Sequence, residues 1–117
     1  MKRIALLGMP NTGKSTLFNR LTGAHAKVGN WPGLTVELLN ARLILGDQVV
    51  QLVDLPGIYD LHGFSDDEKV VTTFLDTQKT DLIIFVLNTS QYERQLNLLS
   101  QVIAKGIPVL VVMNMVD

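Results

Sequence analysis

Residues 8–16 read GMPNTGKST and directly follow the apolar run IALL. Glycine is a poor helix former, and a lysine at a helix start lies at the unfavourable, positive end of the helix dipole. A helix that begins near Lys14 therefore carries a local cost, which a bound anion would offset. This stretch constrains the fold strongly, because it needs a strand before it and a helix after it.

The stretch from Gly8 to Ser15 fits the pattern G-x-x-x-x-G-K-[ST] of a phosphate-binding P-loop. Gly8 and Gly13 allow backbone N–H groups to turn toward phosphate oxygens, and the helix start adds its own free N–H groups. We expect Lys14 to reach the β- and γ-phosphates and the Ser15 hydroxyl to ligate Mg²⁺. The predicted nucleotide-binding residues of this stretch are Gly8, Pro10, Asn11, Thr12, Gly13, Lys14, Ser15 and Thr16.

The rest of the chain alternates predicted strands and helices. Gly46-Asp47 is a hairpin dipeptide, and Ser65 with Glu68 and Ser90 with Glu93 fit the capping box of a helix start. Strands are predicted at 3–7, 39–45, 49–53, 81–88 and 107–113, and helices at 14–21, after Ser65 and after Ser90. This order predicts one α/β domain over residues 1–117, of the three-layer P-loop NTPase type. Its sheet would be mostly parallel, with one antiparallel hairpin strand.

Two further stretches give predictions from their composition and spacing. Residues 23–35 carry Gly, Asn and Pro without a period and are predicted to be a long loop. In the last helix, Tyr92, Leu96, Leu99 and Ile103 are spaced to form one apolar face, which we expect to be buried.

Composition excludes several classes of function. The chain has 117 residues, a net charge of −1 and no cysteine, which excludes disulfides and thiol chemistry and disfavours nucleic acid as a partner. No apolar run approaches the roughly 18 residues of a membrane-spanning helix, so a soluble, intracellular chain is expected. His25 and His62 lie far apart in polar stretches and are expected to be solvated rather than metal ligands.

Residues after two strands select the nucleotide. Asp117 of NMVD can accept hydrogen bonds from guanine N1–H and N2–H together, which adenine cannot offer, and Asn114 could tie this loop to the P-loop. Asp54 opens DLPG and suits a Walker-B role, holding Mg²⁺ through its water shell. The Gly57 N–H can donate a hydrogen bond to the γ-phosphate. Loss of the γ-phosphate would then release the segment that follows Gly57.

A second switch residue is predicted in the long loop. Thr35 is the only threonine between residues 23 and 45, and its hydroxyl would ligate Mg²⁺ and sense the γ-phosphate. Ile58 occupies the position at which Ras-like enzymes orient the attacking water with glutamine, and its side chain cannot do so. We therefore assign no general base. The expected catalytic residues are Lys14, Thr35, Gly57 and Asn11.

These motifs in this order resemble a translation-factor-class small GTPase. Residues 28–37, VGNWPGLTVE, together with DLPGIYDL and NMVD closely resemble the G domain of the FeoB family of bacterial ferrous iron transporters, with a weaker likeness to its cyanobacterial members. The resemblance covers essentially the whole chain. Met115 replaces the lysine of the usual NKxD motif, as FeoB sequences often allow, and would belong to the same base-binding loop.

The resemblance implies a slow GTPase that binds GTP and GDP with Mg²⁺ and regulates or energises Fe²⁺ uptake. It places the chain at the cytoplasmic face of the bacterial inner membrane. Its expected partners are guanine nucleotide, the helical and transmembrane regions of the same protein, and a second copy in a homo-oligomer. Asn11 matches an asparagine that helps bind an activating K⁺, with backbone carbonyls near Gly29 and Trp31 completing that site.

The resemblance also implies that the G domain is incomplete after Asp117, because one more strand and helix would carry a last guanine-contacting loop. The strand over 107–113 would then have an unpaired, apolar edge. Two alternatives stay open. One is a GTPase of ribosome assembly or tRNA modification of the Era, EngA or MnmE type, although PGLTVE lacks the Arg-Asp of their PGTTRD-like switch. The other is a guanine-nucleotide-binding scaffold that does not hydrolyse GTP.

Overall fold

The structure is a computed structural model that describes residues 1–114; residues 115–117 lie outside the described part. The strands are β1 (Lys2–Gly8), β2 (Lys27–Gly29), β3 (Leu38–Leu45), β4 (Gln48–Asp54), β5 (Leu82–Asn88) and β6 (Val109–Asn114). The helices are α1 (Lys14–Thr22), α2 (Asp66–Thr77) and α3 (Tyr92–Ile103), with a short 3₁₀ helix η1 (Gly23–His25). Within this described part, no helix combines the length and apolar character needed to cross a membrane.

The strands form a single mixed sheet in the order β2-β3-β4-β1-β5-β6. β1 runs parallel to β4 and β5, and β6 runs parallel to β5. β3 pairs antiparallel with β4 through the two-residue turn Gly46-Asp47, which confirms the predicted hairpin. The predicted loop 23–35 is wrong in part, because its residues 27–29 pair with β3 as strand β2. Three residues are too few to show a readable alternation, so this pairing depends on the neighbouring strand.

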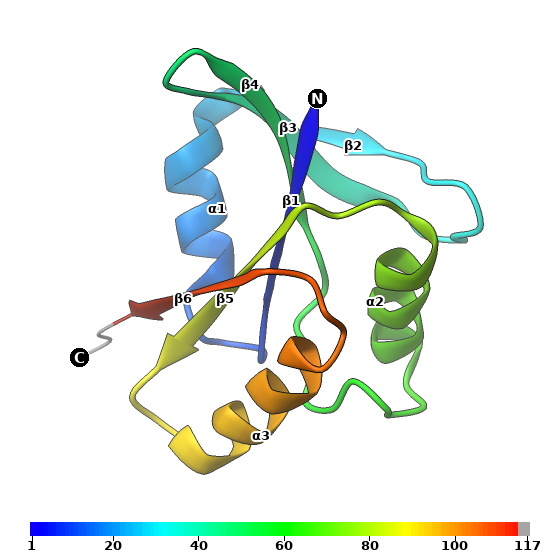
Figure 1. Cartoon of the computed structure of the whole chain (residues 1–117), viewed down its shortest axis with the longest axis vertical. Coiled ribbons are helices and arrows are strands. Elements are labelled where there is room, and N and C mark those ends of the chain that lie inside the picture. Colours follow the sequence, from blue (N-terminus) through cyan, green and yellow to red (C-terminus); the bar gives the residue numbers. More distant parts are fainter. Residues whose placement is uncertain (115–117) are drawn as a thin grey trace.

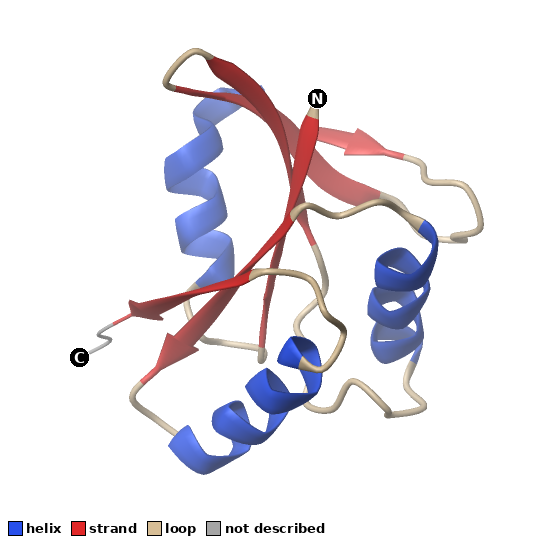
Figure 2. Ribbon diagram, in the orientation of Figure 1, coloured by secondary structure: helices blue, strands red, loops and turns tan. Residues whose placement is uncertain are grey.

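Helices cover both faces of the sheet (Figure 1, Figure 2), as predicted. β1 is buried on both sides, because successive side chains of a strand point to opposite faces. Ile4 and Leu6 join the cluster that contains Phe18 of α1. Ala5 and Leu7 join the larger cluster that contains residues of α2 and α3. The chain therefore has the three-layer α/β/α architecture of a P-loop NTPase, with the loops that follow the parallel strands β1, β4 and β5 at one edge of the sheet.

Helix α3 buries a different face from the predicted one. Tyr92, Leu96 and Ile103 are exposed, whereas the buried positions of α3 are Gln95, Leu98 and Val102. The predicted capping box at Ser90 is also wrong, because the N-cap is Gln91 and makes no side-chain capping bond. Leu99 of the predicted stripe is half-buried against the core. The polar Gln95 shares the buried face with Leu98 and Val102, and hydrophobic spacing alone does not predict a polar residue there.

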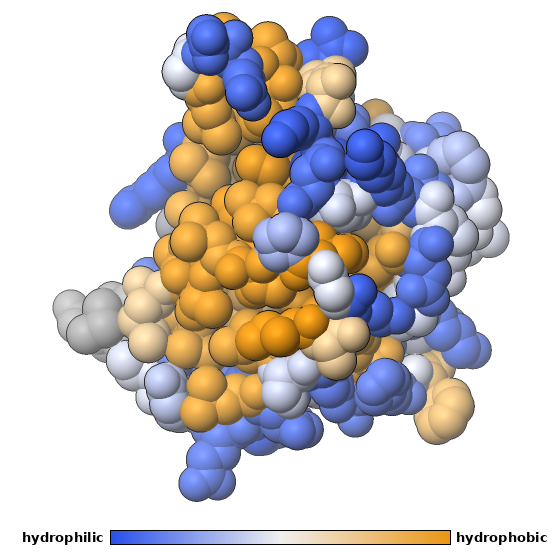
Figure 3. Space-filling view, viewed as in Figure 1, coloured by the Kyte–Doolittle hydropathy of each residue, from blue (hydrophilic) through white to orange (hydrophobic). Residues whose placement is uncertain are grey.

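Strand β6 lies at the end of the strand order and carries exposed apolar side chains, namely Leu110, Val111 and Met113. Figure 3 shows hydrophobic surface gathered over this part of the sheet. The predicted apolar edge is therefore present. In the isolated chain it is the surface at which self-association is expected, because unpaired strand edges and apolar patches promote it.

Candidate nucleotide-binding site

The P-loop joins the end of β1 to the start of α1, and its two terminal glycines are both required. A Cβ on Gly8 would lie 2.8 Å from the Val86 carbonyl oxygen. Gly13 has φ +89°, a conformation that side-chain-bearing residues rarely adopt, and a Cβ there would overlap the Asn114 amide. The loop therefore has the shape that its sequence predicts, with α1 beginning at Lys14.

The one charged group of the loop is paired within the site. Lys14 Nζ donates to Asp54 Oδ1 at the end of β4, and both side chains are largely buried. The structure thus brings together the predicted phosphate-binding lysine and the predicted Walker-B aspartate. Ser15 and Thr16, the next residues of α1, are exposed.

Two asparagines hold the backbone of the loop. Asn114 Nδ2 donates to the Thr12 carbonyl at 3.0 Å, which is the expected tie between the NMVD stretch and the P-loop. Asn88 Nδ2 donates to the Asn11 carbonyl at 3.3 Å. Sequence reasoning missed Asn88. Its one signal was a polar residue at the end of the buried strand 81–88.

The turn DLPG packs directly under the loop. Leu55 N–H donates to the Leu6 carbonyl and Ile58 N–H to the Gly8 carbonyl, each at 3.1 Å. A Cβ on Gly57 would lie 2.9 Å from the Pro10 backbone, so only glycine fits without a shift. The Ile58 side chain is buried in the core.

The segment after DLPG is organised around Glu68. Its carboxylate accepts from Asp60 N–H at 3.0 Å, from Ser65 N–H at 3.2 Å and from Ser65 Oγ at 2.7 Å. Ser65 also caps α2, so the predicted capping box is confirmed. The Ser65 side-chain hydrogen bond holds the pKa of Glu68 below its ordinary value, and backbone N–H groups of Ser65 and Asp60 add to this.

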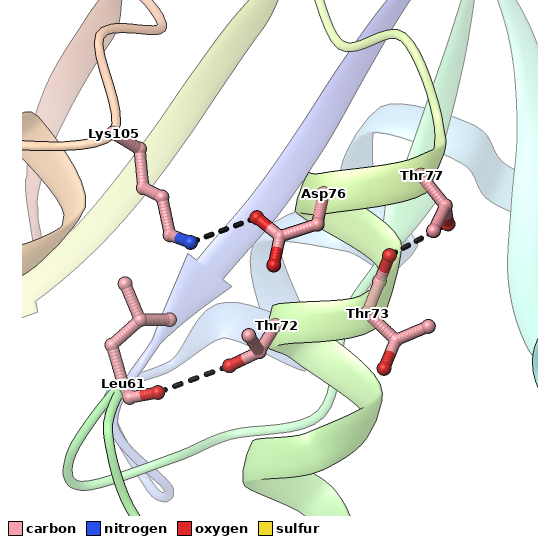
Figure 4. A network of polar contacts seen from close by, with 6 residues as sticks. All are labelled: Leu61, Thr72, Thr73, Asp76, Thr77 and Lys105. Carbon is pink, nitrogen blue, oxygen red and sulfur yellow. Dashed lines mark hydrogen bonds and ion pairs between the residues drawn. The ribbon is translucent and has the colours of Figure 1, made fainter.

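Further hydrogen bonds tie the same segment to α2 and to α3, and an ion pair joins these two helices. Thr72 Oγ1 of α2 donates to the Leu61 carbonyl at 3.0 Å (Figure 4), and Leu61 N–H donates to Gln101 Oε1 of α3 at 2.7 Å. An ion pair between Lys105 and Asp76, at 2.9 Å, joins the end of α3 to α2 (Figure 4).

Replacing Glu68 with glutamine should weaken the segment in a pH-dependent way. Because the pKa of Glu68 is lower in the folded chain than its ordinary 4.5, the charged form contributes stability above the ordinary value. That contribution is lost as the pH falls through the lowered pKa. Urea unfolding should show wild type more stable than Glu68→Gln at neutral pH, with the difference disappearing in acid. Glu93→Gln, in the first turn of α3, is the matched control, and an equal pH effect there would contradict the assignment.

The predicted switch I residues lie apart from Lys14 and Asp54. Thr35 lines a hollow beside α2 with Lys69, Val70 and Thr73. The Trp31 ring packs edge-on against Phe74, at 5.2 Å between centroids. Gly29 ends the edge strand β2. The structure therefore does not bring Thr35, Gly29 and Trp31 together with Asn11 or Ser15 in this arrangement. Met115 and Asp117 lie outside the described residues.

The residues at the site fit Mg²⁺ but provide few ligands of their own. Among residues 1–114, no cluster of three or more acidic or histidine side chains could hold a metal ion, and both histidines are exposed. Asp54 and the Ser15 hydroxyl offer oxygen, the donor that Mg²⁺ prefers. Mg²⁺ in nucleotide sites commonly uses one or two protein oxygens and completes its shell with phosphate and water, so the sparse set is compatible with it.

A family model described as "Ferrous iron transport protein B" matches residues 2–117. The chain belongs to this family. The Fe(2+) transporter FeoB of Synechocystis sp. is 52% identical over 116 residues, which cover 99% of this chain and 19% of that protein. The chain spans between 15% and 19% of the length of the FeoB relatives compared.

Solved FeoB structures share the fold. The G domain of the T. maritima FeoB iron transporter has a TM-score of 0.88 at 39% identity, over 97% of this chain and 71% of that one. A variant of S. thermophilus NFeoB bound to GDP has a TM-score of 0.86 at 42% identity, over 97% of this chain and 44% of that one. This chain therefore has the FeoB G-domain fold, which is a GTPase fold, and the predicted fold and family are both confirmed.

Proposed function

We propose that the chain is the GTP-binding and GTP-hydrolysing switch domain of a ferrous iron transport protein. The observation that carries this proposal is the pairing of Lys14 with Asp54 beneath a P-loop in a FeoB-family chain. The GDP bound to the S. thermophilus relative supports a guanine nucleotide as ligand. Family membership also favours iron transport over ribosome assembly or tRNA modification.

Nucleotide binding would use the positive charge of Lys14, which already lies in the site. Lys14 would exchange its contact with Asp54 for the β- and γ-phosphates, while the N–H groups of Gly13 and the start of α1 bind phosphate oxygens. Bound Mg²⁺ would neutralise charge that develops on the phosphates. Ser15, Asp54 and Thr35 are the residues proposed to hold it. Asn114, Met115 and Asp117 would bind the guanine base.

Hydrolysis is proposed to be slow and stimulated by K⁺. The buried Ile58 cannot position water, so turnover would depend on charge stabilisation rather than on a side-chain base. K⁺ would be held by Asn11 and by carbonyls near Gly29 and Trp31. Because Trp31 packs on Phe74, the residues around it would have to leave α2 before they could reach Asn11.

The remainder of the function concerns the whole protein. We propose that this G domain works as part of a longer iron transport protein at the cytoplasmic face of the inner membrane, because the chain spans only 15% to 19% of the length of the FeoB relatives compared. Its binding partners there would be the helical and transmembrane regions of the same protein, and a second copy in a homo-oligomer. GTP binding or hydrolysis would regulate or energise Fe²⁺ uptake.

The test compares nucleotides and cations on the full-length protein. Calorimetry with Mg²⁺ should show GDP binding about 10⁴-fold tighter than ADP, because a site with paired hydrogen bonds rejects a base that leaves them unmade. GTP turnover should be faster in K⁺ than in Na⁺. Equal affinity for GDP and ADP would contradict the guanine site. Tight GTP binding without turnover in either salt would instead support a scaffold.

A further inference from the structure

A buried amide network lies behind the P-loop. Gln95 of α3 is almost fully buried, and its Oε1 accepts from Asn88 N–H at 2.8 Å. Gln95 Nε2 donates to Asn88 Oδ1 at 2.9 Å, to the Asn88 carbonyl at 3.2 Å and to the Ser90 carbonyl. Ser90 donates to Asn88 Oδ1 through both its N–H and its hydroxyl. Asn88 is therefore fixed from several sides.

The free end of Asn88 points at the P-loop. With its Oδ1 occupied by Gln95 and Ser90, its Nδ2 donates to the Asn11 carbonyl at 3.3 Å. The β5–β6 register makes Asn88 and Asn114 direct neighbours, and Asn114 Nδ2 donates to the Thr12 carbonyl. Two adjacent strand ends therefore hold two successive carbonyls of the loop.

Holding a carbonyl also sets the direction of an N–H group. In a trans peptide the carbonyl and the N–H of the next residue point in opposite directions. The bond from Asn88 thus turns the Thr12 N–H away from β5, and the bond from Asn114 turns the Gly13 N–H away from β6. Asn11 has φ +65°, in the left-handed region that asparagine tolerates better than most residues, and the bond from Asn88 fixes the carbonyl of this turn.

We infer that Asn88, braced by Gln95, is a positioning residue that orients the P-loop N–H groups for phosphate. The inference rests on the proposed nucleotide site and adds two residues that its motifs do not contain. It also explains why the buried face of α3 includes the polar Gln95 beside Leu98 and Val102.

The test measures GDP affinity and stability separately on the full-length protein with Mg²⁺. Asn88→Ala should bind GDP roughly five- to tenfold more weakly, the effect of losing about one hydrogen bond. Gln95→Met keeps the side-chain volume and should weaken binding in the same direction. Asn97→Ala, an exposed position on α3, is the matched control and should change affinity less than twofold.

A purely structural role would lower the urea midpoint without changing GDP affinity under conditions in which the protein is folded. A positioning role should also speed hydrogen exchange at Thr12 and Gly13, and Asn88→Ala with Asn114→Ala should combine non-additively. A folded Asn88→Ala protein with GDP affinity within twofold of wild type would overturn the inference. If that variant does not fold, Gln95→Met decides by the same criterion. Failure of wild type to bind GDP would instead overturn the proposed function.

Discussion

Replacing Lys14 with alanine should lower GDP affinity by about 10²- to 10⁴-fold. Charge-assisted hydrogen bonds contribute about 1.5–3 kcal/mol each, and Lys14 is expected to make two of them with phosphates. Its loss also leaves the Asp54 carboxylate, now unpaired, close to the incoming phosphates. Calorimetry on the full-length protein, with Mg²⁺ present, measures the effect.

Two variants separate this role from a general loss of charge. Lys105→Ala also breaks a lysine–aspartate pair, but that pair is more exposed and joins α3 to α2, so GDP affinity should stay unchanged. When a chelator has removed Mg²⁺, Asp54→Asn should raise GDP affinity, which is the opposite effect. The substitution releases Lys14 from its ion pair, so that Lys14 is free to bind the phosphates. Retention of GDP affinity within tenfold by Lys14→Ala would contradict its phosphate role.

Local signals in the sequence predicted the parts of this molecule that depend on neighbouring residues. Gly46-Asp47 forms its hairpin, and Ser65 with Glu68 forms its capping box. The strand–loop–helix around Lys14 also follows from local chemistry, because the glycines permit backbone shapes that other residues resist. The motif order then placed Asp54 opposite Lys14, since the carboxyl ends of parallel strands meet at one edge of the sheet.

The features that sequence reasoning missed depend on contacts distant in the chain. Gln95 is polar and lies outside the predicted apolar stripe of α3, yet its amide satisfies Asn88 in the interior. A buried amide is stable only with such hydrogen-bond partners, and the spacing of residues within the helix does not predict which partners it will have. Strand β2 likewise exists because β3 offers it an edge.

The packing of the Trp31 side chain is a further feature that the sequence alone did not predict. The family resemblance implies an ion site that uses backbone carbonyls near Trp31 and says nothing of its side chain, whose ring packs against Phe74 with the Arg3 guanidinium 4.9 Å from the ring centroid. Arg3 lies near the start of β1 and Asn11 lies beyond its end. An aromatic residue in a loop can anchor that loop to the core or serve a ligand, and its sequence neighbours do not distinguish the two.

Replacing Phe74 with alanine should therefore destabilise the fold and release the Trp31 segment together. Phe74 is fully buried, and truncation of such a side chain costs about 3–5 kcal/mol of unfolding free energy. Trp31 also loses its edge-on partner, a contribution of about 0.5–1.5 kcal/mol beyond area alone. Urea unfolding measures the first effect. The second should appear as a red shift of the emission of Trp31, the only tryptophan in the chain.

Phe64→Ala is the matched control, because Phe64 precedes the same helix and is 88% exposed. It should change neither stability nor emission appreciably. If Trp31 must leave Phe74 before its neighbours can contact Asn11, weakening this packing should also make the segment from Trp31 to Thr35 easier to recruit. In the Phe74→Ala protein, the rate of GTP turnover should then reach half of its K⁺-stimulated maximum at a lower K⁺ concentration than in wild type. An unchanged K⁺ dependence in a folded Phe74→Ala protein would show that Trp31 packing does not control access to Asn11.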